Sequence, residues 1–72
     1  MLTTKQIERA VEETRDFGYS YLGELCFDVI KDSKKVNNYL RKHDITDMYL
    51  IYRGDEYRDT RDGSGWFLII PA

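Results

Sequence analysis

The sequence predicts a single small α+β domain over residues 1–72, in which three helices are followed by an antiparallel β-hairpin. Three observations predict this order. Apolar residues recur at helical spacing early in the chain, cations gather between residues 32 and 43, and two short apolar runs near the end are rich in β-forming residues. With 42% hydrophobic and 33% charged residues, the chain has the composition of a folded domain with a small core.

The first predicted element is a helix over residues 4–16. Thr3 and Gln6 have the spacing of a capping box, which closes the start of a helix. Gly18 is the expected stop, because glycine adopts the left-handed conformation that ends many helices. The apolar stripe of this helix consists of Ile7, Ala10, Val11, Thr14 and Phe17.

Residues 19–30 fit two structures, and the choice between them decides the fold. With a period of 3.6 they form a helix, and with a period of two they form a half-buried strand. We favour the helix, because its spacing to the next segment suits a pair of crossing helices. The strand would instead make the domain an α/β sandwich. The helical stripe is Leu22, Leu25, Cys26 and Val29, and the strand face is Tyr19, Tyr21, Leu25, Phe27 and Val29.

A basic helix is predicted over residues 33–43, with Asp32 or Ser33 as its N-cap. Its apolar face consists of Val36, Tyr39 and Leu40. The segment from 32 to 43 has four cations and one acid, whereas the other sixty residues have seven basic and twelve acidic side chains. The charges are therefore segregated along the chain. The opposite surface of this helix carries Lys34, Lys35, Asn37, Asn38, Arg41 and Lys42.

Two strands are predicted at residues 48–52 and 66–70, separated by a polar segment rich in turn-forming residues. In that segment, Gly54 and Asp55 suit a two-residue turn, which would leave residues 56–61 as a polar middle strand. Otherwise the segment is one long loop.

The run from Trp66 to Ile70 has no polar position, so both of its faces need cover. A second copy of the chain is the simplest source of that cover, and we expect a homodimer through Trp66–Ile70. The alternative is that the helix over residues 4–16 covers one face and tyrosines cover the other.

Between Leu22 and Leu40 the chain resembles the winged helix-turn-helix family of DNA-binding proteins. The resemblance is carried by the aliphatic residues of the two central segments and by the small residue Cys26 at the expected helix crossing. It implies a winged-helix-like domain that places the helix over residues 33–43 in the major groove of DNA. It also implies a wing over residues 52–66, with Arg53, Arg58 and Arg61 near the DNA backbone or the minor groove.

These observations predict a small DNA-binding regulator that acts as a homodimer on double-stranded DNA. Cations attract phosphate, and asparagine side chains hydrogen-bond base edges. The alternative function is a non-enzymatic protein-interaction module or small inhibitor, for example from a phage, which binds a protein through a tyrosine-rich surface. The predicted nucleic-acid-binding residues are Ser33, Lys34, Lys35, Asn37, Asn38, Arg41, Lys42, Arg58 and Arg61.

The sequence has none of the motifs that mark an enzyme or a metal site. One Cys, one His and no glycine-rich phosphate loop leave no catalytic triad and no dinucleotide-binding motif. We therefore expect no catalytic residue, no cofactor and no metal. No apolar run approaches the ~20 residues of a membrane-spanning helix, and the polar first ten residues do not have the pattern of a signal peptide. We expect a cytoplasmic protein.

Overall fold

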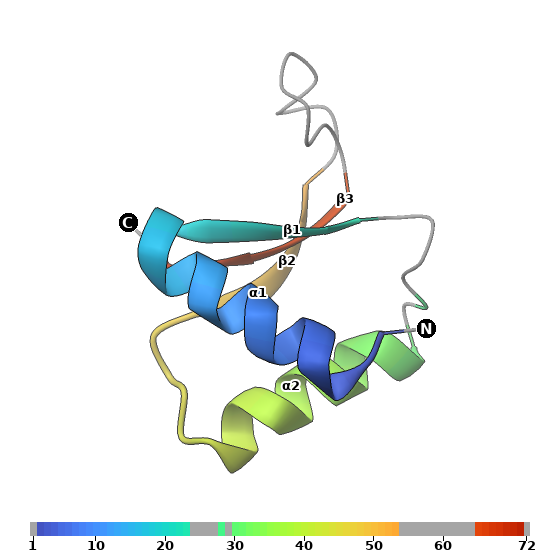
Figure 1. Ribbon diagram of the computed structural model, residues 1–72. Helices are drawn as coiled ribbons and strands as arrows, with labels where there is room; N and C mark the ends of the chain where they lie inside the picture. The colour runs from blue at the N-terminus through green and yellow to red at the C-terminus, as the bar shows by residue number, and fades with distance from the viewer. Residues whose placement is uncertain (1, 24–27, 29, 54–64, 72) are drawn as a thin grey trace.

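The computed structural model describes residues 2–23, 28, 30–53 and 65–71, and these form two helices and a three-stranded antiparallel sheet (Figure 1). The architecture is α+β, as predicted, but it has two helices where the sequence predicted three. Both helices lie on the same side of the sheet (Figure 1). The elements in chain order are α1 (Thr4–Phe17), β1 (Tyr19–Gly23), α2 (Lys31–Lys42), β2 (Tyr49–Arg53) and β3 (Gly65–Ile69).

Helix α1 begins and ends at the residues that the sequence indicated. The Thr3 side chain accepts a hydrogen bond from the Gln6 amide, and the Gln6 side chain accepts one from the Thr3 amide. At the other end, Gly18 adopts a φ of 90° and its amide donates to the carbonyl of Thr14 at 2.8 Å. The capping box and the glycine stop are both confirmed.

The predicted helix over residues 19–30 is wrong at its start, because residues 19–23 form strand β1. This strand pairs with β3, and Tyr19 lies opposite Ile69. Leu22 lies in β1 and is the extra residue at an irregularity, because Tyr21 pairs with Phe67 and Gly23 pairs with Trp66. Such an irregularity interrupts period-two alternation. Residues 24–27 and 29 lie outside the described residues.

The start of α2 differs from the prediction, because neither Asp32 nor Ser33 is the N-cap. The N-cap is Ile30, whose side chain makes no capping hydrogen bond, and the carboxylate of Asp28 instead accepts from the amides of Ile30 (3.1 Å) and Lys31 (2.9 Å). Asp32 lies in the first turn of the helix and is fully buried. Its carboxylate accepts from the amides of Asp28 (2.6 Å) and Leu2 (3.3 Å). Asp32 therefore ties the start of the chain to α2.

The sheet has the strand order β1-β3-β2, with β3 antiparallel to both neighbours. The predicted antiparallel pair of the last two strands is confirmed, each shifted by one residue from its predicted bounds. Because β1 and β2 both run antiparallel to β3, they are parallel to each other, and α2 makes the crossover between them. This is a split β-α-β arrangement with β3 inserted in the middle. The predicted turn at Gly54-Asp55 lies outside the described residues.

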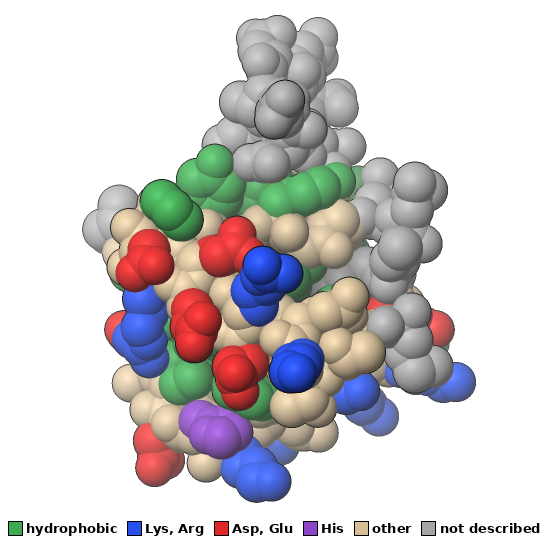
Figure 2. Space-filling model, viewed as in Figure 1, with side chains coloured by type: hydrophobic (Ala, Val, Ile, Leu, Met, Phe, Trp, Pro, Cys, Tyr) green, Lys and Arg blue, Asp and Glu red, His purple; other side chains and the backbone are tan. Residues whose placement is uncertain are grey.

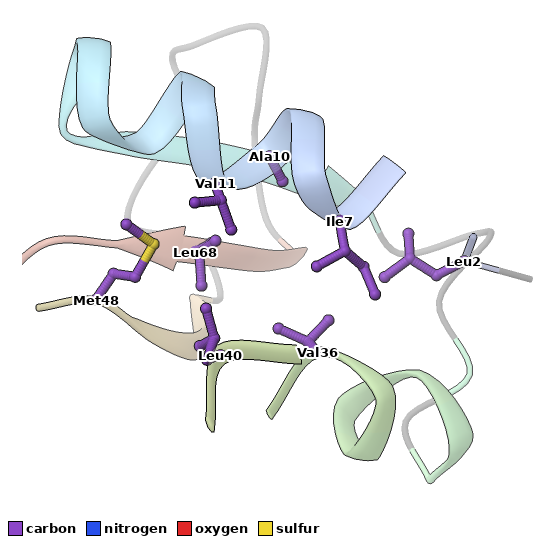
Figure 3. Close-up of a cluster of buried hydrophobic side chains, with 8 residues drawn as sticks. All are labelled: Leu2, Ile7, Ala10, Val11, Val36, Leu40, Met48 and Leu68. Carbon is purple, nitrogen blue, oxygen red and sulfur yellow. The ribbon is translucent and has the colours of Figure 1, made fainter. Parts of the chain in front are cut away.

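The core lies between the two helices and the inner face of the sheet (Figure 3). Helix α1 packs on β1 and β3, and α2 packs on β2 and on α1. In Figure 3, Val11 of α1 and Leu40 of α2 point toward Leu68 of β3, which is completely buried. The buried cluster consists of Leu2, Ile7, Ala10, Val11, Val36, Leu40, Met48 and Leu68.

The apolar strand that motivated the predicted homodimer lies at the centre of the sheet. Leu68 faces the helices, and Phe67, on the opposite face, is only 2% exposed. The rings of Tyr19 and Tyr21 pack against Phe67, with centroids 6.1 and 5.1 Å away. The chain therefore covers much of this strand itself, by the alternative route of one helix and tyrosines. A second copy of the chain is therefore not needed to bury Phe67 and Leu68, and the homodimer through Trp66–Ile70 stays a prediction.

Candidate functional site: an aromatic sheet face and a basic helix

The side of the sheet that faces away from the helices carries two rows of large side chains, which we call the tyrosine face. In the first row, Ile69 of β3 lies between Tyr19 of β1 and Tyr49 of β2. The neighbouring row, Ser20, Leu68 and Leu50, contains the core residue Leu68, so the rows beside it project to the other face. The second row of the tyrosine face is Tyr21, Phe67 and Ile51.

No helix or strand of the described residues covers the tyrosine face. The exposed fractions are 46% for Tyr19, 40% for Tyr49 and 38% for Tyr21, and Ile51 and Ile69 are partly exposed. In Figure 2, hydrophobic side chains form a green band along the top of the molecule, over the sheet. The described residues thus leave a contiguous patch of aromatic and aliphatic surface next to the solvent.

The ring of Tyr21, in β1, lies over Gly65 of the neighbouring strand β3. A Cβ atom placed on Gly65 would be 2.9 Å from Cε1 and 3.0 Å from the hydroxyl of Tyr21. Gly65 also has a φ of 139°, which residues with a side chain rarely adopt. Gly65 therefore makes room for the Tyr21 ring, and this ring forms one edge of the tyrosine face.

The second candidate surface is the outward face of α2. The predicted division of this helix is confirmed: Val36 and Leu40 are buried, and Tyr39 is partly buried against the core. Its single acid, Asp32, is buried, so the exposed charges of α2 are all positive. Ser33 is partly exposed. The exposed residues of this face are Lys31, Lys34, Lys35, Asn37, Asn38, Arg41 and Lys42.

These polar side chains are brought together by the turn of the helix. The guanidinium of Arg41 donates a hydrogen bond to the side-chain oxygen of Asn38, one turn earlier. The helix ends at Lys42, one residue before its predicted end, and His43 follows it; the centroid of the His43 ring lies 4.2 Å from that of Tyr39. A hollow of about 190 Å³ separates this end of α2 from the first turns of α1, and its lining includes Lys35 and Lys42.

Two further residues, Arg58 and Arg61, were predicted to contact nucleic acid. Arg58 and Arg61, together with most of the predicted wing, lie outside the described residues. Of the residues proposed for the first helix of a helix-turn-helix, Leu22 lies in β1, and Leu25, Cys26 and Val29 are not described.

Two further features concern the described part of the chain. No group of three or more His, Cys, Asp or Glu residues there is arranged to hold a metal ion. None of its helices is long and apolar enough to cross a membrane. Comparisons of the chain with models of protein families, with curated proteins and with solved structures find no significant match.

The sequence predicted a tyrosine-rich binding surface as the alternative function, but it did not name the residues that form it. A signal was present, because Tyr19 and Tyr21 alternate in the strand interpretation of residues 19–30, and Tyr49 and Ile51 alternate in the strand that follows α2. Each pattern covers only two or three residues. The pairing register is what joins them into one surface.

Proposed function

We propose that this chain is a non-enzymatic protein-interaction module that binds a partner protein through the tyrosine face. The observation that carries the proposal is the row Tyr19–Ile69–Tyr49, which crosses all three strands with both tyrosines at least 40% exposed. Tyrosine is enriched at the centres of protein interfaces, because its ring buries a large area while its hydroxyl keeps a polar contact. A small inhibitor of a larger protein would be one form of such a module.

The energetics of a small domain support this assignment. A chain of 72 residues has a small free energy of unfolding, and each apolar side chain buried in the core raises it. By the sheet register, Tyr19, Tyr49 and Ile69 instead project to the face opposite the core residue Leu68. Contiguous apolar surface on a soluble domain is typical of an interaction site.

A photocrosslinking experiment tests the proposal in the full chain. A photoreactive phenylalanine analogue replaces Tyr49 in one variant and Glu8, exposed on α1, in a control variant. The protein captured only from position 49 is then purified and titrated with the wild-type chain. We expect the double variant Tyr19→Ser with Tyr49→Ser to bind about 100-fold more weakly, which corresponds to about 1.4 kcal/mol for each interface tyrosine.

The result is decisive only if the variants remain folded, which circular dichroism checks. Lys5→Ser with Arg9→Ser, on the exposed face of α1, should bind like the wild type. A purified partner that binds the folded double tyrosine variant with unchanged affinity would contradict the proposal.

A second candidate function is DNA binding by α2. It is favoured by one observation: the exposed charges of this helix are all cations, and its single acid is buried. Phosphate contacts from Lys34, Lys35, Arg41 and Lys42 would give an affinity that falls steeply as salt rises, because bound counterions are released. Asn37 and Asn38 would contact bases, and a homodimer would present two copies of α2 to successive grooves.

Gel retardation of a duplex separates this candidate from non-specific attraction. Lys34→Glu with Arg41→Glu should abolish the retarded band without unfolding the domain. Lys5→Glu with Arg9→Glu makes the same change in net charge on α1 and should retain binding. Equal retardation by wild type and both double variants would rule out a role for α2.

A further inference from the structure

A hollow of about 270 Å³ lies beside β1, where α1 ends. Side chains alternate along a strand, and the residues of this hollow come from both faces of β1. Tyr19 and Tyr21 belong to the tyrosine face, whereas Ser20 is buried on the helix side. The hollow therefore lies against the outer edge of β1. Its lining consists of Glu13, Phe17, Tyr19, Ser20 and Tyr21.

The chemistry of this lining is that of a site for a cation. It contains three aromatic rings and one carboxylate, and none of its five residues is basic. The face of an aromatic ring carries partial negative charge and attracts the ammonium of Lys or the guanidinium of Arg. Phe17 is 73% exposed, although it ends the apolar stripe of α1. A bound aliphatic stem with a charged end would cover this ring.

The surroundings of the hollow reinforce the preference for positive charge. Helix α1 ends at Phe17, and the carbonyl end of a helix carries partial negative charge. The basic residue of its last turn is Arg15, whose guanidinium lies 3.1 Å from the carboxylate of Asp47. Arg15 is thus paired away from Glu13. Figure 2 shows acidic and basic side chains interspersed on the face of α1, so the preference for positive charge is local to Glu13 and the end of the helix.

The backbone beside the hollow suits an extended ligand. Within the described residues, β1 pairs with β3 along one side and with no strand along the other. The outer edge of a terminal strand offers backbone amide and carbonyl groups to an added strand. A segment lying there would place alternate side chains toward the tyrosine face and toward Glu13.

We infer that this hollow binds the Lys or Arg side chain of an extended segment of a partner protein, which lies along the outer edge of β1. The inference rests on the proposed protein-interaction function and names the chemistry of the partner. It commits the partner to an unfolded or strand-like basic segment rather than to a helix.

The test uses the full ¹⁵N-labelled chain and two capped heptapeptides of alternating Thr and Val, one with Arg at its centre and one with Glu there. The Arg peptide should shift the amide signals of Glu13 and of residues 19–23, and the Glu peptide should bind at least ten-fold more weakly. Glu13→Lys should weaken binding of the Arg peptide at least ten-fold. Phe17→Ser should weaken it two- to five-fold, as expected for one exposed cation–π contact.

The matched control is Glu8→Lys, which makes the same charge change on α1 outside the hollow and should leave binding unchanged. Equal binding of the two peptides, binding of neither, or shifts that lie away from β1 would overturn the inference. A dimer that Glu13→Lys converts to a monomer would also overturn it, by making a second copy of the chain the occupant.

The outcome is separable from that of the proposed function, because Tyr49 does not line the hollow. If the crosslinked partner is lost on Tyr49→Ser but binds Glu13→Lys normally, the tyrosine face binds a partner and the cation site is wrong. If Glu13→Lys weakens peptide binding while Tyr49→Ser leaves the crosslinked partner bound, the cation site is supported and binding through the tyrosine face is contradicted.

Discussion

The ring of Tyr21 lies over Gly65 on the neighbouring strand, so closely that a Cβ atom on Gly65 would be 2.9 Å from Tyr21 Cε1. Gly65→Ala would therefore introduce a steric clash as well as an unfavourable φ of 139°. We expect a loss of about 1–3 kcal/mol in the free energy of unfolding, measured by urea denaturation. The Tyr21 ring should also move, which its aromatic proton shifts would report.

A matched control separates the clash from the backbone strain. Gly18 has a φ of 90°, but a Cβ atom there would have no neighbour within 4 Å. Gly18→Ala should therefore destabilise through strain alone and leave the Tyr21 signals in place. In the double variant Gly65→Ala with Tyr21→Ser the clash is removed. The double variant should therefore lose less unfolding free energy than the two single variants lose in total. Strict additivity would show that the two residues do not interact.

The buried carboxylate of Asp32 predicts a second effect on stability. Its two oxygens accept hydrogen bonds from the amides of Leu2 and Asp28, so Asp32→Ala leaves two donors without this acceptor. We expect a loss of about 1–3 kcal/mol in urea denaturation. Asp28→Ala removes the acceptor of the Ile30 and Lys31 amides at the start of α2 and should cost about 1 kcal/mol. An unchanged unfolding midpoint for Asp32→Ala would show that this tether contributes nothing.

Thr14 predicts how α1 is held on the sheet. Its hydroxyl is fully buried and lies 2.7 Å from the carbonyl oxygen of Ala10 and 3.3 Å from that of Leu68. Thr14→Val keeps the shape but removes the donor, and we expect a loss of about 0.5–1.5 kcal/mol. Thr46→Val, at an exposed position before β2, should change stability little. Thermal denaturation of both variants makes the comparison.

The parts of the fold that follow from local interactions were predictable from the sequence. Helix α1 depends on the nearby residues Thr3, Gln6 and Gly18, and its bounds were correct to one residue. The two faces of α2 follow from the spacing of Val36 and Leu40, so the exposed cations were predictable as well. In each case the stabilising partner lies within a few residues in the chain.

Strand β1 was not predictable in this way, because its stabilising partners are distant. Tyr19 pairs with Ile69, fifty positions later, and a local window sees only a pattern compatible with both periods. The irregularity at Leu22 also blurs the alternation that would have marked a strand. The tyrosine face was not predictable for the same reason. Only the pairing register shows that Tyr19 and Tyr49 flank Ile69.

The position of Phe67 changes what a substitution in the last strand should do. A homodimer through Trp66–Ile70 predicts that Phe67→Asp gives a soluble, folded monomer. In the structure Phe67 is 2% exposed beneath Tyr19 and Tyr21, so an aspartate there would be a buried charge without a partner in place. Such a charge costs several kcal/mol, a large share of the ~5 kcal/mol that holds a small domain together.

We therefore expect Phe67→Asp to unfold the chain, seen as loss of the cooperative thermal transition in circular dichroism. Ile69→Asp is the matched variant, because Ile69 lies on the same face of β3 but is only partly buried. It should remain folded with lower stability. Light scattering of the wild type and of Ile69→Asp should give the same mass, near the 8.6 kDa of one chain. A wild-type mass twice that value, halved by Ile69→Asp, would restore the homodimer and make the tyrosine face its interface.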